Sequence, residues 1–222
     1  FTSGGTESDN WAILGALELQ PGKKHIVTTA VEHEAVRKLC EKLEKQGCEV
    51  TWLGVDEQGE LDLGELKKAI RPDTAIVSIM TANNQTGVIF PVAEVAGIVK
   101  ENSDALFHTD GVNAAGKMPI DLKNTQIDMM SISGHKFYAP KGIGALYIRN
   151  GVALPSSLIG GGQENGRRAG TEAAHQIAGL GAAAALMTDL TSLGQIRVLR
   201  DRLESGILAS IPNASVNGGG NR

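Results

Sequence analysis

Short apolar segments alternate with amphipathic segments along residues 25–150, and this alternation constrains the fold more than any other feature of the sequence. Residues 25–29 (HIVTT) are typical of a buried strand, and residues 32–47 place apolar side chains three and four positions apart, as a helix does. The order then repeats, with further strands predicted at 48–55, 74–81, 105–110, 127–133 and 144–150 and helices at 63–70 and 92–102. Strands and helices that alternate at such short intervals form a mostly parallel sheet covered on both faces. We therefore predict an α/β fold, a three-layer sandwich with a mostly parallel sheet.

The composition favours small-molecule chemistry. The chain has 222 residues, 41% of them apolar and 21% charged, and its net charge of -4 comes without a basic run, which argues against nucleic acid or an anionic membrane as the main partner. No apolar stretch is long enough to span a bilayer and no basic-then-apolar leader opens the chain, so we expect a cytoplasmic protein. The 2 cysteines have neither the number nor the spacing of a disulfide framework or a zinc site, and we expect no metal.

The chain divides into a large and a small unit by its pattern. Residues 1–187 carry the alternating elements, and a charged amphipathic helix near residue 190 begins a second, smaller unit over residues 188–222. The first residue is Phe1 rather than Met, and the last residues, SVNGGGNR, are typical of a turn. We interpret the sequence as a piece of a longer protein, with its second unit incomplete.

Polar side chains follow the predicted strands at the point where each strand ends. His33 comes after the strand at 25–29, and Asn84 after the strand at 74–81. Asp110 ends its strand, and Lys136 follows the next one. Because active sites in such sheets lie beyond the carboxyl ends of the strands, these side chains are expected to meet in one site.

Two glycine-marked segments precede helices, at residues 2–19 and 160–187. Each offers free backbone N–H groups and a threonine hydroxyl at a helix N-terminus, which suits a phosphate group. Either segment alone is more often only a capped turn, since Ser, Thr and Gly before a helix are common capping residues. Together with a strand-end lysine and aspartate, they form the set that pyridoxal phosphate requires: an amine to bind it covalently, a carboxylate for its ring nitrogen, and donors for its phosphate.

Six motifs, taken in order, resemble the cysteine desulfurases, pyridoxal-phosphate enzymes of the class V aminotransferase family, and above all the branch that supplies sulfur for iron–sulfur clusters. The motifs are TSGGTESDN, EHEAV, NNQTG, HTDGVNAAGK, SGHKFYAPKGIGALY and GGGQENGRRAGTE. The resemblance covers residues 1 to about 185. It implies the large domain of fold type I with a seven-stranded sheet, and a homodimer. The full enzyme would convert L-cysteine to L-alanine and pass sulfur, as a persulfide, to an acceptor or iron–sulfur scaffold protein.

The resemblance also implies roles for single residues. It makes Lys136 the residue that binds the cofactor covalently, Asp110 the partner of the ring nitrogen, and His33 the group that stacks on the ring and helps to move protons. Asn84 resembles an asparagine near the substrate carboxylate. The implied phosphate ligands are Gly5, Thr6, Ser133, His135 and, from the neighbouring subunit, Thr171.

Each of these residues also has a structural interpretation. A lysine beside a turn is usually a solvated charge, which is the interpretation we give to Lys141. Asp110 and His33 both stand where a side chain can cap a helix. His108 is more often structural, and Arg168 either bridges a dimer, steadies the phosphate loop or is solvated.

Two positions depart from the family pattern. Asn113 stands where the family typically has a glutamine that approaches the cofactor's phenolic oxygen, so this contact either passes through a water or is lost. Gly111 stands where alanine is usual, which predicts a small loosening beside Asp110.

The sequence leaves the activity open between related chemistries. Cys40 and Cys48 are predicted to be core thiols, and the resemblance puts the sulfur-accepting cysteine and the arginine for the substrate carboxylate beyond this chain. The alternatives are therefore a selenocysteine lyase, another fold type I lyase or aminotransferase, and a non-catalytic docking platform.

Overall fold

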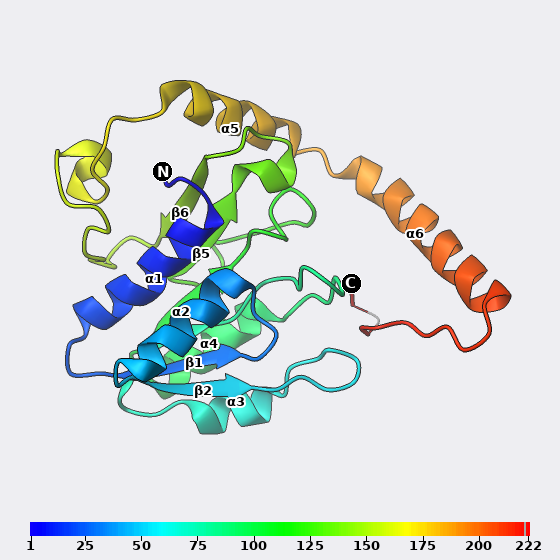
Figure 1. Ribbon diagram of the computed structural model, residues 1–222, viewed down its shortest axis with the longest axis horizontal. Helices are drawn as coiled ribbons and strands as arrows, with labels where there is room; N and C mark the ends of the chain where they lie inside the picture. The colour runs from blue at the N-terminus through cyan, green and yellow to red at the C-terminus, as the bar shows by residue number, and fades with distance from the viewer. Residues whose placement is uncertain (220) are drawn as a thin grey trace.

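Six strands form one sheet in the order β2-β1-β3-β4-β5-β6 in the computed structural model, which describes residues 1–219 and 221–222 (Figure 1). β1 to β5 are parallel, and β6 runs antiparallel to β5 at one edge. The mostly parallel sheet is thus confirmed, with six strands in place of the seven implied by resemblance. The strands are β1 (His25–Thr29), β2 (Glu49–Leu53), β3 (Thr74–Ser78), β4 (Leu106–Asp110), β5 (Met129–Ser133) and β6 (Gly144–Ile148).

Helices follow most of the parallel strands, as the sequence predicted. Asp62 begins one of them by accepting hydrogen bonds from two backbone N–H groups of the first turn, and Gly47 follows the end of another at a positive φ of 94°. The α-helices are α1 (Gly5–Leu19), α2 (Glu34–Lys45), α3 (Leu63–Ala69), α4 (Val92–Asn102), α5 (Ala174–Leu186) and α6 (Thr191–Ser210), and the 3-10 helices are η1 (Gly134–Phe137) and η2 (Gln163–Gly166).

Helices cover both faces of the sheet. Neighbouring strand residues point to opposite faces, so Ile26 and Ile76 pack against α1 and α2, whereas Val27 and Val77 pack against α3 and α4. All four strand residues are fully buried. Two apolar layers therefore enclose the sheet, which confirms the three-layer sandwich.

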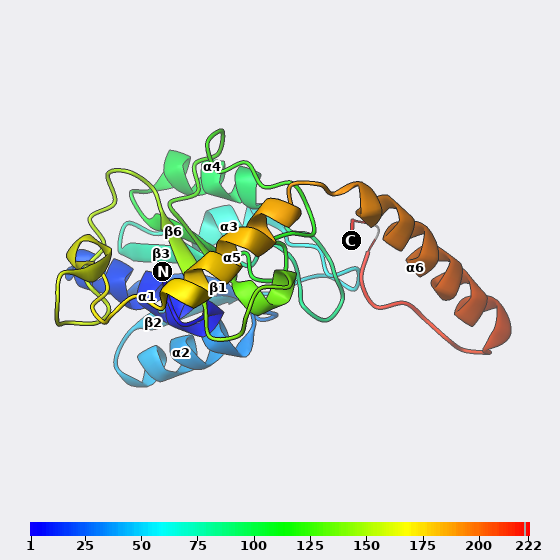
Figure 2. The same ribbon diagram turned by 90° about the horizontal axis from the view of Figure 1, so that it is seen from above.

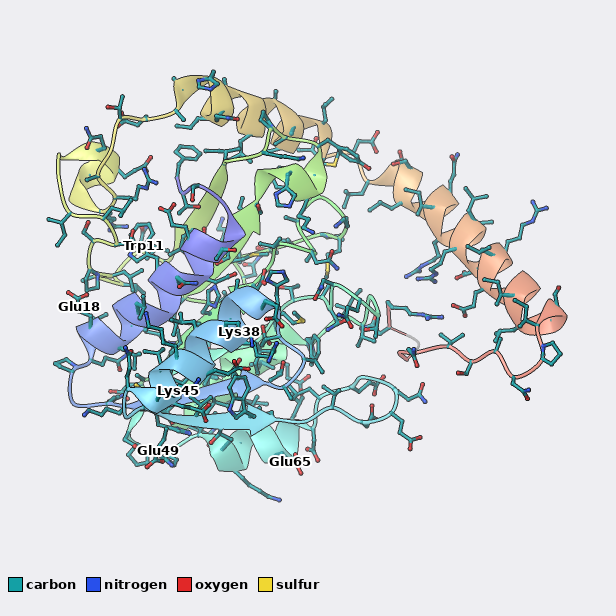
Figure 3. The ribbon with its side chains drawn as sticks, viewed as in Figure 1. Trp11, Glu18, Lys38, Lys45, Glu49 and Glu65 are labelled. Carbon is teal, nitrogen blue, oxygen red and sulfur yellow. The ribbon has the colours of Figure 1, made fainter. Side chains whose placement is uncertain are left out.

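The helix surfaces show the predicted division between core and solvent. The apolar stripe of α2 is buried, and Lys38 and Lys45 of the same helix are exposed outside it, as are Glu49 of β2 and Glu65 of α3 on their own elements (Figure 3). On α1, Trp11 is 5% exposed, and its indole N–H donates a hydrogen bond to the carbonyl of Pro155 at 2.7 Å. The buried stripe of α2 consists of Ala35, Val36, Leu39, Cys40 and Leu43.

The last two helices differ in their packing. Leu180 and Ala183 of α5 pack against Phe137 of η1, whereas α6 buries no residue and extends away from the sheet (Figures 1 and 2). Among the described residues no single helix could cross a membrane, and only α5 and α6 taken together, bent by 75°, have the length and composition to do so.

Candidate active site

Nine of the ten predicted site residues line one pocket of about 160 Å³. They come from the carboxyl ends of β1, β3, β4 and β5 and from the first turn of α1, which meet on one side of the sheet (Figure 1). This is the edge where the topology of a parallel sheet places a site. The lining residues are Gly5, Thr6, Asp9, His33, Met80, Ala82, Asn84, Asp110, Val112, Asn113, Ser133, His135 and Lys136.

Lys136 reaches the pocket because the chain turns tightly after β5. A Cβ atom on Gly134 would lie 2.9 Å from the Cβ of Ala139, so only glycine fits at the start of η1. Tyr138 ends η1 in the left-handed conformation with φ 69°. Phe137 is buried against α5, which leaves the neighbouring Lys136 exposed towards the pocket.

Asp110 is a buried acid at the end of β4. It is 5% exposed, and its Oδ1 atom accepts a hydrogen bond from the N–H of Val112 at 2.9 Å. Burial raises the pKa of Asp110, and the Val112 N–H and the charges of His33 and Lys136 only partly oppose this shift. A cationic group in the pocket would therefore stabilise the ionised form of Asp110.

His33 both caps a helix and lines the pocket, so it occupies its structural and its predicted functional position at once. Its Nδ1 atom accepts a hydrogen bond from the N–H of Ala35 at 3.1 Å, which caps α2 and leaves the proton on Nε2. The same ring lines the pocket. The cap holds the ring in place, so the two interpretations of His33 are compatible.

The first turn of α1 forms the anion-binding end of the pocket. Gly4 has φ 153° and approaches β6 so closely that a Cβ atom on Gly144 would lie 2.8 Å from the Gly4 Cα. Among the described residues no side chain caps α1, so the N–H groups of its first turn, at Gly5 and Thr6, face the pocket without a capping partner there. The helix N-terminus therefore offers the donors that a phosphate needs.

Two further polar groups stand beside this helix end. Ser133 and His135 are joined by a hydrogen bond of 3.0 Å between Oγ and Nδ1, and both line the pocket. A Cβ atom on Gly4 would approach the Ser133 Oγ to 3.6 Å, so the hydroxyl lies directly at the glycine turn.

Thr171 lies apart from the other predicted residues. It is exposed and lines a separate recess of about 90 Å³ with Phe1 and Glu164. Arg168, three residues earlier, pairs with Glu7 of α1 at 2.9 Å and 3.2 Å. The loop that carries Thr171 is thereby tied to the helix of the anion-binding end.

The structure shows what contacts Asn113 and Gly111, the two positions that depart from the family pattern. The amide of Asn113 donates to the carbonyl of Asn83 at 3.1 Å and accepts from the Lys117 Nζ at 3.2 Å. The loosening expected at Gly111 is wrong, because the Met130 side chain fills the space, with its Cε 1.8 Å from the position of an added Cβ.

The sequence interpretation missed Asp9, although it lines the pocket and is 1% exposed. Its spacing of four residues from Gly5, on the same face of α1, was the signal that could have identified it. His108 is structural, as predicted: it is fully buried between Ser78 and Ser131, at 2.8 Å and 2.9 Å. Burial lowers the pKa of His108 to about 3, so the ring is neutral.

The cysteines belong to the core, as predicted. Cys40 is fully buried among α1, α2 and the sheet, and burial raises its pKa to about 12. Cys48 packs partly buried against the same cluster. In residues 1–219 and 221–222 no three histidine, cysteine or acidic side chains gather as metal ligands would.

The fold and the pocket define an α/β protein with a lysine, an acid and an anion-binding helix end at one edge of a parallel sheet. The sequence matches the family Aminotransferase class-V over residues 1–218. The chain belongs to this class V aminotransferase family.

Named relatives share most of this chain. Cysteine desulfurase 2 of Trichormus variabilis is 54% identical over 219 residues, which make up 98% of this chain and 55% of that protein. Cysteine desulfurase NifS of Azotobacter vinelandii is 51% identical over 220 residues, 98% of this chain and 54% of that protein. The chain thus spans about half the length of the curated relatives it matches.

Solved structures agree with the fold. A NifS-like protein superposes with a TM-score of 0.89 at 39% identity, over 94% of this chain and 58% of that one. DndA from Streptomyces lividans superposes with a TM-score of 0.86 at 41% identity, over 98% of this chain and 63% of that one. SspA in complex with cysteine superposes with a TM-score of 0.79 at 40% identity, over 83% of this chain and 54% of that one.

Proposed function

We propose that this chain is the cofactor-binding part of a cysteine desulfurase that uses pyridoxal phosphate. The observation that carries the proposal is the pocket in which Lys136, Asp110 and the first turn of α1 meet. Relatives at 51% to 54% identity are named cysteine desulfurases, and a solved relative holds cysteine. These names support the same substrate for the full-length protein.

The pocket residues fit pyridoxal phosphate in charge and in donor chemistry. The N–H groups of Gly5 and Thr6 and the hydroxyl of Ser133 would hold the phosphate, with His135 beside them. Asp110, whose burial disfavours an unpaired charge, would pair with the ring nitrogen. The cofactor would supply an electron sink for the bonds at the substrate's α-carbon.

The protein's own groups would move protons and orient the substrate. Lys136 would hold the cofactor through its Nζ and would accept the proton from the substrate's Cα, with His33 Nε2 as a second proton carrier. Asn84, exposed at the pocket, orients the substrate carboxylate. In the net reaction the Cβ–S bond of L-cysteine is replaced by a Cβ–H bond, and an acceptor thiolate takes the sulfur as a persulfide.

The acceptor thiol would come from outside this chain, because Cys40 and Cys48 both pack in the core. The substrate-carboxylate arginine would come from there too. We place the large domain at residues 1–187 and the start of the small domain at 188–222, a division supported by the exposed α6. The proposal includes a cytoplasmic homodimer that delivers sulfur to an iron–sulfur scaffold protein.

The attachment of the cofactor is tested by reduction with borohydride after pyridoxal phosphate is added to the full-length protein. Peptide mapping should find the phosphopyridoxyl group on Lys136, and Lys136→Ala should lose it. Lys141→Ala is the matched control, since this exposed lysine lies five residues away outside the pocket. A label on Lys141, or on no lysine, would contradict the assignment.

The substrate is tested by measuring alanine and sulfide from L-cysteine in the presence of a thiol reductant, which releases the persulfide sulfur as sulfide. Equal amounts of the two products support a desulfurase. Turnover of L-selenocysteine alone would identify a selenocysteine lyase, and a protein that forms no lysine adduct would be a docking platform.

A further inference from the structure

Three carboxyl groups are buried at or near the pocket without a basic side chain to neutralise them: Asp9 and Asp110 line it, and Glu32 lies directly before the pocket residue His33. Asp9 is 1% exposed, Asp110 5% and Glu32 6%. Among the described residues, none of the three pairs with a lysine or arginine, and the nearest recorded base is the neutral His108, 3.6 Å from Asp9 Oδ1. Since a buried unpaired carboxylate costs several kcal/mol, such groups take up protons instead.

The three acids differ in how well the protein supports their ionised forms. Glu32 Oε1 accepts from the Met80 N–H at 2.9 Å and the Thr29 hydroxyl at 2.8 Å. Asp110 accepts from one backbone N–H. The buried Oδ1 of Asp9 has no hydrogen-bond partner within the described chain. Asp9 is therefore the acid that costs most to ionise.

The electrostatic surroundings of Asp9 point the same way. Its pKa is raised well above the usual range by burial first and by the charge of Asp110 next; the Ser131 hydroxyl opposes these two effects, and the charge of Glu32 adds a smaller increase. The side chains of Lys136 and His33 are exposed on the rim of the pocket, where they act on Asp110.

Ser131 and His108 offer a place for the proton of Asp9. When the neutral ring donates its Nδ1 proton to Ser78, its Nε2 lone pair accepts the Ser131 hydroxyl proton at 2.9 Å, and Asp9 Oδ1 lies 3.6 Å from the same nitrogen. A protonated Asp9 would complete this chain by donating its O–H group to the Ser131 oxygen. The chain would join α1, which bears the anion-binding end, to β4, which bears Asp110.

We propose that Asp9 is a positioning residue for the cofactor: its carboxyl group stays protonated, links α1 to β4 through His108, and leaves Asp110 as the only anion that meets the ring nitrogen. The proposal rests on the proposed function, which assigns the phosphate to α1 and the nitrogen to Asp110. Asp9 then sets the separation between the two ends of the cofactor site.

The first test measures the dissociation constant of pyridoxal phosphate for the full-length protein by fluorescence. Asp9→Asn keeps the shape and a donor, so its affinity should stay within about twofold of the wild type. Asp9→Ala removes the link and should bind roughly five- to tenfold more weakly. Asp201→Asn, on the exposed α6, is the control and should leave affinity unchanged.

The second test measures urea unfolding of the cofactor-free protein between about pH 5 and about pH 8. Because the pKa of Asp9 is raised in the folded protein, the stability due to its protonated form is complete below the ordinary value of 3.8 and is lost as the pH rises through the raised value. Asp9→Asn cannot ionise, so its urea midpoint should fall less with pH than that of the wild type.

The outcomes separate this proposal from the proposed function. A tenfold loss of affinity in Asp9→Asn, with a wild-type pH dependence of unfolding, would show an ionised Asp9 and overturn the proposal. Wild-type affinity in Asp9→Ala would also overturn it. If the wild type bound no pyridoxal phosphate, the proposed function would fail, whereas the unfolding measurement would still decide the protonation of Asp9.

Discussion

The polar groups around the pocket fall into two sets that the protein treats differently. The buried acids, Asp9, Glu32 and Asp110, are enclosed by the protein, and burial raises the pKa of each. The exposed rim stays in contact with solvent and consists of Thr6, His33, Asn84, His135 and Lys136. Burying acids without bases reduces the stability of the empty protein, whereas the rim costs little.

This difference indicates where the binding energy of a cationic ligand comes from. A ligand that brings positive charge to Asp110 relieves a cost that folding has already imposed. The rim adds contacts but relieves no such cost. Substitutions in the two sets should therefore separate stability from binding.

The largest effect is expected for Asp110→Asn. Losing a charge-assisted hydrogen bond to the ring nitrogen should weaken the binding of pyridoxal phosphate by roughly 10- to 100-fold. The empty protein should become more stable at about pH 8, because the raised pKa of Asp110 makes the wild type lose stability as the pH rises. Cofactor titration and urea unfolding of the same samples check both parts.

The contrast between the buried acids and the exposed rim fails if Asp110→Asn lowers both the affinity for pyridoxal phosphate and the stability of the cofactor-free protein. That result would mean that Asp110 supports the fold of β4 through its hydrogen bond to Val112. Asp121→Asn, at an exposed site, controls for the loss of a negative charge as such.

Glu32→Gln should change stability and leave binding nearly intact. Burial raises the pKa of Glu32 from 4.5 to about 8, so the stability of its protonated form is complete below pH 4.5 and is lost as the pH rises towards 8. One such group changes the free energy of unfolding by at most about 1.4 kcal/mol per pH unit. Glutamine cannot ionise, so Glu32→Gln should remove this group's contribution to the change of unfolding free energy with pH. Urea unfolding at several pH values would measure that change.

Glu34→Gln is the matched control for this slope. Glu34 is exposed two residues away, and a hydrogen bond from Arg37 lowers its pKa. Its stabilising effect is therefore lost only as the pH falls below the ordinary carboxyl range. Equal slopes in Glu32→Gln and the wild type would show that Glu32 is not a buried neutral acid.

The exposed rim and the fold were more accessible to sequence analysis than the buried acids. Runs such as residues 74–78 identify themselves as strands by their apolar, β-branched composition, and the rule of strand ends then identifies Lys136 and Asp110. Family resemblance supplied the roles of His33 and Asn84. Both kinds of signal are local in the chain.

The buried acids depend on contacts that are distant in sequence. Glu32 is held by the N–H of Met80, 48 residues away, and Asp9 lies 3.6 Å from the buried ring of His108 in β4. Neither partner can be identified from the local pattern. The packing of the Met130 side chain against Gly111 also could not be predicted from the local pattern, because it depends on how the adjacent strands β4 and β5 pack.

The smallest loss of cofactor affinity is expected for Thr171→Ala. This substitution tests whether the exposed rim includes a residue from a second subunit. Thr171 lies outside the pocket of its own chain, in a loop fixed to α1 by the Arg168–Glu7 pair. If it reaches the phosphate of the partner's cofactor, removing one neutral hydroxyl should cost about 0.5–1.5 kcal/mol, a several-fold loss of affinity. Stability should not change, and Thr188→Ala, another exposed threonine, should change neither.

Mixed dimers decide whether Thr171 acts across the interface. When one subunit carries Thr171→Ala and the other Lys136→Ala, both substitutions affect the same site, because that site takes its lysine from one chain and its threonine from the other. The second site stays intact, so the dimer should bind one cofactor with wild-type affinity. When both substitutions lie on one subunit, each site carries one of them and neither keeps wild-type affinity. Equal cofactor binding by the two arrangements would show that Thr171 serves neither site, and better binding when both substitutions lie on one subunit would place Thr171 at its own subunit's site. Either result would leave the exposed rim within a single chain.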